Sequence, residues 1–411
     1  MKILQVNVVY KTGSTGKIVE RLHRGLKNDG LQSIVCYGRG KKTEQENVYK
    51  VCSEFESNLC HAWSYICGIP DAGQLFSTQK LKRIISREKP DIVHLHCLNG
   101  YFVSMYRFLN WLKVKNIKVV LTLHAEFMYT GGCAHALDCQ KWRNGENCNS
   151  CDKYRQNTGS RFFNRSVRIF SRMKEAFDGF QNNMKIISVS PWLYSRAKSS
   201  PILNRFEHSV VLNGIDTSVF RRYNTDEMKE SFGFKDKKII FHPTANFSDE
   251  EGHIKGGRYL IELANSLKDE NVVFLVAGIY KEGIKVPENI ILLGKLDNQV
   301  ELARYYSMAD ITVITSLKET FSMVVPESLC CGTPVVGFKA GAPEQITIKE
   351  YSEFVESGDV EGLRHAVLNW LNREKDDCLP KLANEKYSSE AMYKGYKKVY
   401  CDFLEEHEEG V

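Results

Sequence analysis

The sequence lacks any uninterrupted apolar run near the roughly 18 residues that a bilayer-spanning helix needs, although 43% of its 411 residues are apolar. It has no internal repeat, no low-complexity tract and no nucleic-acid-binding motif of recognised spacing. Its first residues, KILQVNVVY, form a strand pattern and not the layout of a signal peptide. We therefore expect a globular cytoplasmic protein without a nucleic-acid partner.

Thirteen cysteines are present, an odd number that argues against the fully paired disulfide framework of a secreted protein. Four of them cluster in TGGCAHALDCQKWRNGENCNSCDKY. The C-x2-C half has the spacing of a zinc knuckle, whereas the other half is irregular. Two interpretations stay open, a structural zinc site and reduced or redox-sensitive thiols, and both concern Cys133, Cys139, Cys148 and Cys151.

The net charge of +6 conceals an imbalance between the two halves of the chain. Residues 1–215 hold 32 Lys and Arg against 16 Asp and Glu, and the remainder holds 24 against 34. A basic N-terminal half suits an anionic membrane surface, which we favour over a merely solvated basic face. Basic stretches occur at Leu81–Lys89 and Arg161–Phe180, and the second either lies on a bilayer or packs its apolar face on a sheet. The pattern predicts a peripheral protein at the inner face of the plasma membrane.

Short strand patterns alternate with helix-length amphipathic segments, and the alternation restarts after residue 236. This pattern predicts an α/β protein with two Rossmann-like, doubly wound parallel-sheet domains. Their expected bounds are 1–213 and 214–387, with a last helix within 388–411 that returns to the first domain. Because doubly wound sheets bind ligands at the carboxyl ends of their strands, we expect the site in a cleft between the domains.

The stretch KETFSMVVPESLCCGTPVVGFKAGAPE places Glu319 and Glu327 eight residues apart across a loop-to-helix junction. Ser322 is the expected N-cap, Pro326 falls in the first helical turn, and Gly332 ends the helix. One carboxylate then lies in the loop and the other about a turn into the helix, beside amides that favour a bound anion. The arrangement suits a hydroxyl-rich anionic ligand, although surface helices also carry such pairs as solvated charge.

Two glycine-containing loops that follow strands are candidates for phosphate binding. In KTGSTGKI, Gly13 and Gly16 precede a helix and allow the backbone to approach a phosphate. In HPTANFSDEEGHIKGGRYL, Lys255 comes just before two glycines at a helix start, where a lysine suits a diphosphate. An ordinary turn and a solvated lysine are the alternatives.

Three histidines follow or lie within strand patterns of the N-terminal half. His124 ends KVVLTLH, at the carboxyl end of a strand, where an imidazole can donate to a phosphate or a substrate hydroxyl. His94 and His96 share one face of DIVHLH, and we expect them to be hydrogen-bonded core residues.

Taken together, GSTGKI, TLH, VLNGID, the helix-start lysine and ETFSMVVPESLCCGTPVVGFKAGAPEQI resemble a family 4 retaining glycosyltransferase with the GT-B fold. The resemblance covers nearly the whole chain, and the E-x7-E block is its most specific part. TGGCAHALDCQKW is similar to the branch that builds capsule, exopolysaccharide or O-antigen repeat units. The resemblance implies transfer of a hexose or N-acetylhexosamine from a nucleotide-diphosphate sugar, with UDP favoured over GDP, to a lipid-diphosphate-linked oligosaccharide.

The resemblance also implies residue roles. Glu327 would hold the nucleotide ribose, Glu319 the donor sugar, and Lys255 the leaving diphosphate, while His124 would touch the donor sugar or phosphate. The remaining implied donor contacts are the amides of Thr320, Phe321 and Ser322 and those around Gly13 and Gly16. Catalysis would need no cofactor and no metal, since no D-x-D occurs.

One position departs from the family pattern. Asn246 stands where the family usually has an arginine that joins the lysine on the diphosphate, and Arg258 is the candidate substitute. Two alternative functions stay open, a nucleotide-sugar 2-epimerase on the same architecture and a non-catalytic nucleotide-sugar-binding subunit that activates a partner.

Overall fold

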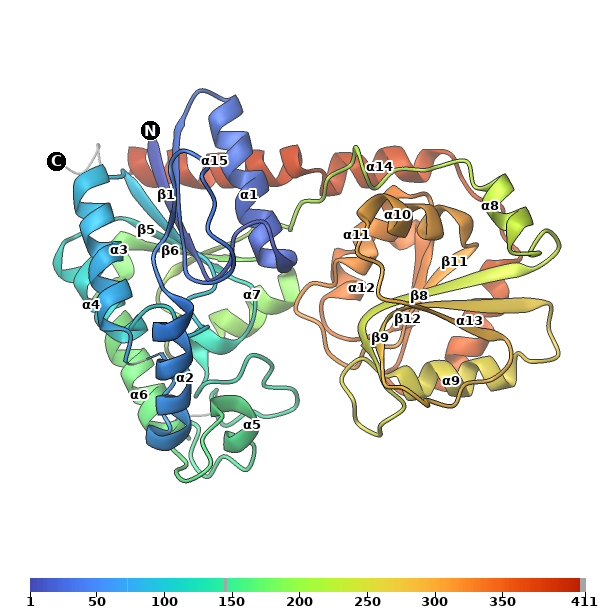
Figure 1. The fold of residues 1–411 in the computed structure, drawn as a ribbon, viewed down its shortest axis with the longest axis horizontal. Coiled ribbons are helices and arrows are strands. Elements are labelled where there is room, and N and C mark those ends of the chain that lie inside the picture. The colour runs from blue at the N-terminus through green and yellow to red at the C-terminus, as the bar shows by residue number, and fades with distance from the viewer. Residues whose placement is uncertain (72, 144–145, 407–411) are drawn as a thin grey trace. The chain divides into compact units, whose positions relative to one another are not determined.

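The computed structural model describes residues 1–71, 73–143 and 146–406, and it divides the chain into two compact units. The first unit comprises Met1–Leu212 together with the C-terminal segment from Met392, and the second comprises Asn213–Ala391. Figure 1 shows both units as α/β folds, each with its own sheet.

Within its described residues, the first unit contains a seven-stranded sheet in the order β3-β2-β1-β4-β5-β6-β7, and every neighbouring pair is parallel. The strands are β1 (Lys2–Asn7), β2 (Gln32–Tyr37), β3 (Val48–Lys50), β4 (Ile92–Leu95), β5 (Val119–Leu123), β6 (Met184–Ser188) and β7 (Glu207–Val210). The helices are α1 (Gly13–Asn28), α2 (Glu54–Cys67), α3 (Leu75–Glu88), α4 (Met105–Val114), α5 (Tyr154–Thr158), α6 (Ser166–Phe177), α7 (Pro191–Lys198) and most of α15 (Ser389–Glu405).

The described residues of the second unit form a six-stranded parallel sheet in the order β10-β9-β8-β11-β12-β13. Its strands are β8 (Lys238–Phe247), β9 (Val272–Tyr280), β10 (Ile290–Gly294), β11 (Ile311–Ile314), β12 (Val335–Phe338) and β13 (Ser352–Val355). Its helices are α8 (Asp226–Ser231), α9 (Gly257–Ser266), α10 (Gln299–Met308), α11 (Val324–Cys330), α12 (Pro343–Ile346), α13 (Val360–Leu371) and α14 (Cys378–Tyr387). The prediction of two Rossmann-like parallel-sheet domains is therefore confirmed.

The core of the first unit explains why its strands are apolar on both faces. Ile3 and Ile92 pack with α1 and α15 in one hydrophobic cluster. Their neighbours Leu4 and Val93, which point to the opposite face, are equally buried. A sheet covered on both faces needs such continuous apolar strands, and these were the segments that the sequence predicted most clearly.

Helix α15 belongs to the core of the first unit. Its buried residues include Tyr396 and Tyr400, whose hydroxyl groups also find partners. The Tyr396 hydroxyl lies 3.0 Å from Thr122 Oγ1, and the Tyr400 hydroxyl lies 2.7 Å from His94 Nδ1. The C-terminal helix thus supplies both apolar area and hydrogen bonds to strand residues 274 and 306 positions earlier in the chain.

Within the described ranges, no helix is both long enough and apolar enough to span a bilayer. The basic segment Arg161–Phe180 is helical only over α6, because residues 161–165 precede the helix. Ile169, Phe170, Met173 and Phe177 of α6 are buried, as in a crossover helix, while Phe162 and Val167 are exposed.

Candidate functional site

Lys255 and Glu319 form an ion pair in the second unit, with Nζ and Oε1 2.6 Å apart. Lys255 lies in the loop between β8 and α9, and its carbonyl accepts a hydrogen bond of 3.1 Å from Thr315 Oγ1. Gly256 follows with φ +63°, and a Cβ there would lie 2.0 Å from the Thr315 carbonyl oxygen. Only glycine fits this close approach, so the glycine places the lysine against the loop that follows β11.

The loop that carries Glu319 is held by backbone and carboxylate hydrogen bonds. The Glu319 N–H donates to the Ala340 carbonyl at 2.9 Å, and the Ala342 N–H donates to the Glu319 carbonyl at 3.2 Å. Glu344 accepts from the N–H groups of Ala340 and Gly341 at 3.1 and 2.9 Å. The sequence pattern did not predict this role of Glu344. The available signal is an acidic residue in the first turn of a helix that starts at a proline.

Glu327 lies in the first turn of α11, as predicted, and its Oε2 accepts a hydrogen bond of 3.0 Å from the Tyr306 hydroxyl. Tyr306 is fully buried against Phe241, and burial beside Glu327 raises the pKa of its phenol well above the usual value. The phenol therefore stays protonated and keeps one carboxylate oxygen oriented. Sequence analysis missed Tyr306, because nothing in a helix 21 residues upstream marks it as the partner of Glu327.

The expectation that Ser322 caps this helix is wrong. Ser322 adopts a left-handed backbone with φ +71°, and the N-cap of α11 is Met323. A capping serine needs an extended backbone, which this loop does not provide. Thr320, Phe321 and Ser322 are all buried, so the loop between the two glutamates is packed. Gly332, with φ +79°, follows the C-cap and ends the helix as predicted.

Two further side chains define the surroundings of Lys255. Arg258 pairs with Glu262 at 2.8 Å and with Glu251 at 3.4 Å, so the Lys255–Glu319 pair forms without it. His242 is buried in β8 and its Nδ1 lies 2.9 Å from the Val313 carbonyl oxygen. Burial, assisted by the charge of Lys255, lowers the pKa of His242 to about 4, so its imidazole is neutral at physiological pH.

In the first unit, Gly13 and Gly16 lie in the first turn of α1, and the expectation that both precede the helix is wrong. Gly13 has φ +64° and open space around its Cβ position, whereas a Cβ on Gly16 would lie 3.2 Å from Lys11 N. Lys11 N–H donates to the Gly16 carbonyl at 3.1 Å, which closes the loop. Asn7 Nδ2 donates to Val9 O at 2.7 Å, and its Oδ1 accepts from Cys97 N–H at 3.1 Å. The β1–α1 loop is therefore tied to the segment after β4.

The three histidines form one connected row beside these loops. His96 Nδ1 lies 3.2 Å from His124 Nε2, and its Nε2 lies 3.3 Å from Gln5 Oε1. His94 and His96 are fully buried and hydrogen-bonded, as predicted, while His124 at the end of β5 keeps some exposure. Burial lowers the pKa of His124 to about 4. At physiological pH this imidazole is a neutral hydrogen-bonding group rather than a cation.

The cysteine cluster holds the four predicted zinc ligands of the first unit. No group of three or more His, Cys, Asp or Glu side chains in the described ranges is arranged to hold a metal ion. All four cysteines are free, and burial together with the neighbouring thiols raises the pKa of Cys133. Cys148 Sγ accepts from Gly131 N–H at 3.2 Å. A structural zinc site and reduced thiols at Cys133, Cys139, Cys148 and Cys151 both stay predictions.

Comparison with known proteins identifies a domain in each unit. Residues 15–219 match the model of Glycosyltransferase Family 4, and residues 242–373 match that of Glycosyl transferases group 1. The chain is a glycosyltransferase. His124 and Gly16 fall within the family 4 domain of the enzyme. Lys255, Glu319 and Glu327 fall within the group 1 domain.

Two curated relatives agree with this assignment, and a solved structure shares the fold. The enzyme is 22% identical to N-acetyl-alpha-D-glucosaminyl L-malate synthase of Bacillus anthracis, over 80% of each chain. It is 29% identical to the putative colanic acid biosynthesis glycosyl transferase WcaC of Escherichia coli, over 37% of this chain and 39% of that one. The crystal structure of Anabaena Alr3699/HepE in complex with UDP superposes with a TM-score of 0.66 at 13% identity, over 98% of this chain and all of that one. The fold is GT-B.

Proposed function

We propose that this glycosyltransferase moves a hexose or N-acetylhexosamine, with retention of anomeric configuration, from a nucleotide-diphosphate sugar to a lipid-linked glycan. The observation that carries the proposal is the Lys255–Glu319 ion pair at 2.6 Å. It lies in the same unit as Glu327, whose carboxylate accepts a hydrogen bond from Tyr306. It offers a cation for a diphosphate and two carboxylates for hydroxyl groups, which are the groups that a nucleotide-diphosphate sugar presents.

In this proposal each half of the donor has its own contacts. Glu327 binds the ribose hydroxyls and Glu319 binds the donor sugar. The backbone amides of Thr320, Phe321 and Ser322 add further hydrogen bonds to the donor. Lys255 neutralises the diphosphate, with Arg258 available once it leaves Glu262. UDP is the favoured nucleotide, and solved structures of Anabaena Alr3699/HepE with UDP and with UDP-glucose support that choice.

The proposed chemistry is a front-face displacement in which the departing phosphate oxygen accepts the proton of the acceptor hydroxyl. Lys255 and the amides around Gly13 and Gly16 stabilise the negative charge that develops on the leaving group. His124 donates a hydrogen bond to the donor sugar or phosphate as a neutral imidazole. No protein nucleophile and no metal ion takes part in this scheme.

The proposed acceptor is a lipid-diphosphate-linked oligosaccharide of surface polysaccharide biosynthesis. The basic first unit would approach the anionic inner face of the plasma membrane, where such an acceptor resides. The name of the WcaC relative, a colanic acid biosynthesis enzyme, supports this class of product. An acceptor-independent 2-epimerase and a non-catalytic activator remain the competing functions.

The decisive experiment has a binding stage and a transfer stage. A thermal-shift panel of UDP, GDP and their common sugars identifies the donor, because a ligand of the folded state raises the apparent stability. The selected donor is then incubated with extracted lipid-linked oligosaccharides. We expect donor-dependent lengthening of the glycan; conversion of the donor without acceptor would favour the epimerase, and absence of transfer from every UDP and GDP sugar would overturn the proposal.

A further inference from the structure

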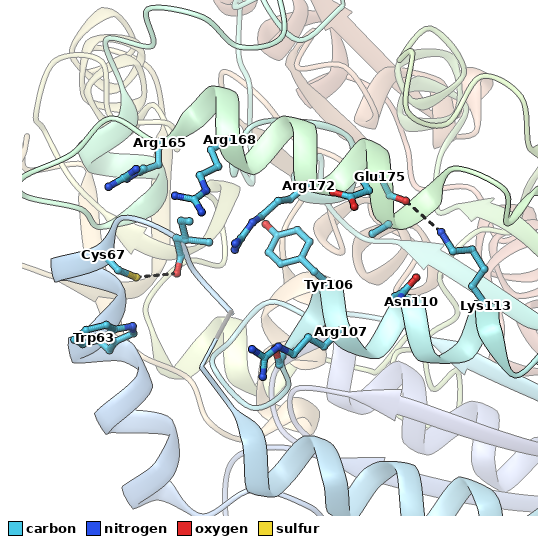
Figure 2. A pocket seen from close by; sticks show the side chains of 13 residues that line it. Trp63, Cys67, Tyr106, Arg107, Asn110, Lys113, Arg165, Arg168, Arg172 and Glu175 are labelled. Carbon is cyan, nitrogen blue, oxygen red and sulfur yellow. Dashed lines mark hydrogen bonds between the residues drawn. The ribbon is translucent and has the colours of Figure 1, made fainter.

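A cavity of about 630 Å³ lies in the first unit between α2, α4 and α6, and none of the proposed donor contacts lines it. Figure 2 shows its walls: Trp63 and Cys67 come from the end of α2, Tyr106 and Arg107 from the start of α4, and the arginines of α6 lie across the top. Neither the glycosyltransferase motifs nor the proposed donor contacts account for it.

The cavity is strongly basic. Four arginines and one lysine line it, against a single acidic residue, and they are Arg107, Arg165, Arg168, Arg172, Lys113 and Glu175. Lys113 is already engaged, because its ammonium donates to the carbonyls of Glu175 and Asp178 at 3.2 and 2.8 Å. The ion pairs found in the described part of the chain include none of the four arginines. Uncompensated arginines around one space favour an anion.

Two buried donors in this wall have no protein partner. The Tyr106 hydroxyl and Arg165 Nε are both buried without a hydrogen bond in the described chain. The Arg172 guanidinium lies 5.9 Å from the centre of the Tyr106 ring, and the two side chains point into the same space (Figure 2). Because a buried donor without a partner is costly, the Tyr106 hydroxyl and Arg165 Nε indicate a ligand with several acceptor oxygens. Phosphate has that property and matches the guanidinium geometry.

The surface beside the cavity is apolar and solvent-exposed. Helix α2 exposes Phe55, Leu59, Trp63 and Ile66 at 79%, 61%, 57% and 52%, and these residues repeat at helical spacing along one face. Phe162 and Phe163, just before α6, are 68% and 47% exposed. Trp63 belongs both to this apolar surface and to the cavity lining. An apolar surface that adjoins a basic cavity matches an anionic lipid better than a soluble anion.

We propose that this cavity binds the phosphate of an anionic membrane phospholipid, with the exposed face of α2 and the Phe162–Phe163 segment inserted among the acyl chains. Arg168 and Arg172 provide charge and bidentate hydrogen bonds, and the Tyr106 hydroxyl donates a further one. The inference rests on the proposed membrane-bound acceptor, but it uses residues of the first unit only and needs no donor. It therefore gives the basic half of the chain a specific lipid contact in place of a diffuse one.

The test is sedimentation of the full chain with vesicles. Phosphatidylcholine vesicles are compared with vesicles that also contain phosphatidic acid, and inorganic phosphate and diphosphate serve as soluble competitors. The test variant is Arg168→Gln/Arg172→Gln, and the matched control is Lys42→Gln/Arg83→Gln, which removes the same charge from exposed positions of the same unit. Tyr106→Phe removes only the buried hydroxyl. UDP-induced thermal stabilisation verifies that each variant is folded.

We expect binding to phosphatidic acid vesicles, a loss of about 30-fold in the arginine variant and a loss below about threefold in the control. Tyr106→Phe should lose about 3- to 10-fold with unchanged UDP stabilisation. Equal losses in the test and control variants would show diffuse attraction and overturn the site. Binding of soluble phosphate through the same arginines, without preference for vesicles, would overturn the lipid assignment. If UDP does not stabilise the wild-type protein, that result counts against the proposed function and not against the lipid site.

Discussion

The ammonium of Lys255 lies 2.6 Å from the carboxylate of Glu319, and both side chains are largely shielded, with exposures of 29% and 14%. In this pair each charge neutralises the other. In the proposed function a donor diphosphate would share Lys255 with Glu319, and a carboxylate oxygen of Glu319 would accept from a sugar hydroxyl. The pair links the nucleotide half of the proposed site to the half where transfer occurs.

Removing either partner should have a different consequence. Lys255→Ala should weaken UDP binding about 10- to 100-fold, because charge-assisted hydrogen bonds to the diphosphate are lost. Glu319→Ala should abolish transfer while UDP affinity falls much less, since its proposed contact is the sugar. Calorimetric titration with UDP and a transfer assay separate the two effects. Lys268→Ala, an exposed lysine of the same unit, is the control. Wild-type transfer in both test variants would refute the site.

The hydrogen bond from Tyr306 to Glu327 should matter for nucleotide affinity. Glu327→Ala should weaken UDP binding about 10- to 100-fold, and Tyr306→Phe, which keeps the buried ring against Phe241, about 3- to 10-fold. In the Glu327→Ala background, Tyr306→Phe should cause little further loss, because the carboxylate that it orients is absent. Equal and additive losses in that double-mutant cycle would show that Tyr306 acts independently of Glu327.

The predictable parts of this protein are those encoded by local patterns. Strands such as KILQVN and KIIFH are apolar along their length because both faces of each sheet are covered, so their pattern is continuous. Helix α2 was not predicted, although Phe55, Leu59, Trp63 and Ile66 repeat at helical spacing in the sequence. These apolar residues face outward, whereas the buried residues of α2 are Ser57 and Ser64. The spacing indicates a helix, but it does not say which face of that helix is buried.

The candidate site was predictable only where its residues are adjacent in the chain. Glu319 and Glu327 flank one loop-to-helix junction, so spacing was sufficient to pair them. Tyr306 and Glu344 act from other elements, and their contacts depend on how those elements pack. Ser322 was predicted as an N-cap from residue preference alone, but its positive φ belongs to the packed loop.

Gly256 should be required for the position of Lys255. In Gly256→Ala the new Cβ would lie 2.0 Å from the Thr315 carbonyl oxygen, and the alanine would also have to adopt a left-handed backbone. The substitution should therefore destabilise the enzyme by more than about 2 kcal/mol and impair transfer. Gly252→Ala is the matched control, because Gly252 has φ +73° in open space. The control should cost only about 1–2 kcal/mol and leave UDP binding unchanged. Chemical denaturation and UDP titration of both variants measure the difference; equal effects would mean that the clash is absent.

Asp71 should make the stability of the first unit depend on pH. It is buried at the start of the segment that leads to α3, and its Oδ1 accepts from Tyr101 and Gly100 N–H at 2.6 and 3.3 Å. Burial raises the pKa of its carboxyl from 3.8 to about 7, although these hydrogen bonds oppose the rise. Between those two values the folded protein retains a proton that the unfolded chain has released. The contribution of Asp71 to stability is therefore greatest below pH 4, falls as the pH rises toward 7, and then levels off.

Asp71→Asn removes this titration and keeps an oxygen that accepts both N–H groups. Between pH 5 and 8 the wild type should lose about 2 kcal/mol more stability than the variant. Urea unfolding at both pH values, followed by a probe in the first unit, measures this difference. Asp152→Asn, at an exposed position of the same unit, should behave as the wild type. A parallel pH dependence of wild type and Asp71→Asn would mean that the Asp71 carboxyl is ionised in the folded protein, with its charge stabilised by the two backbone amides.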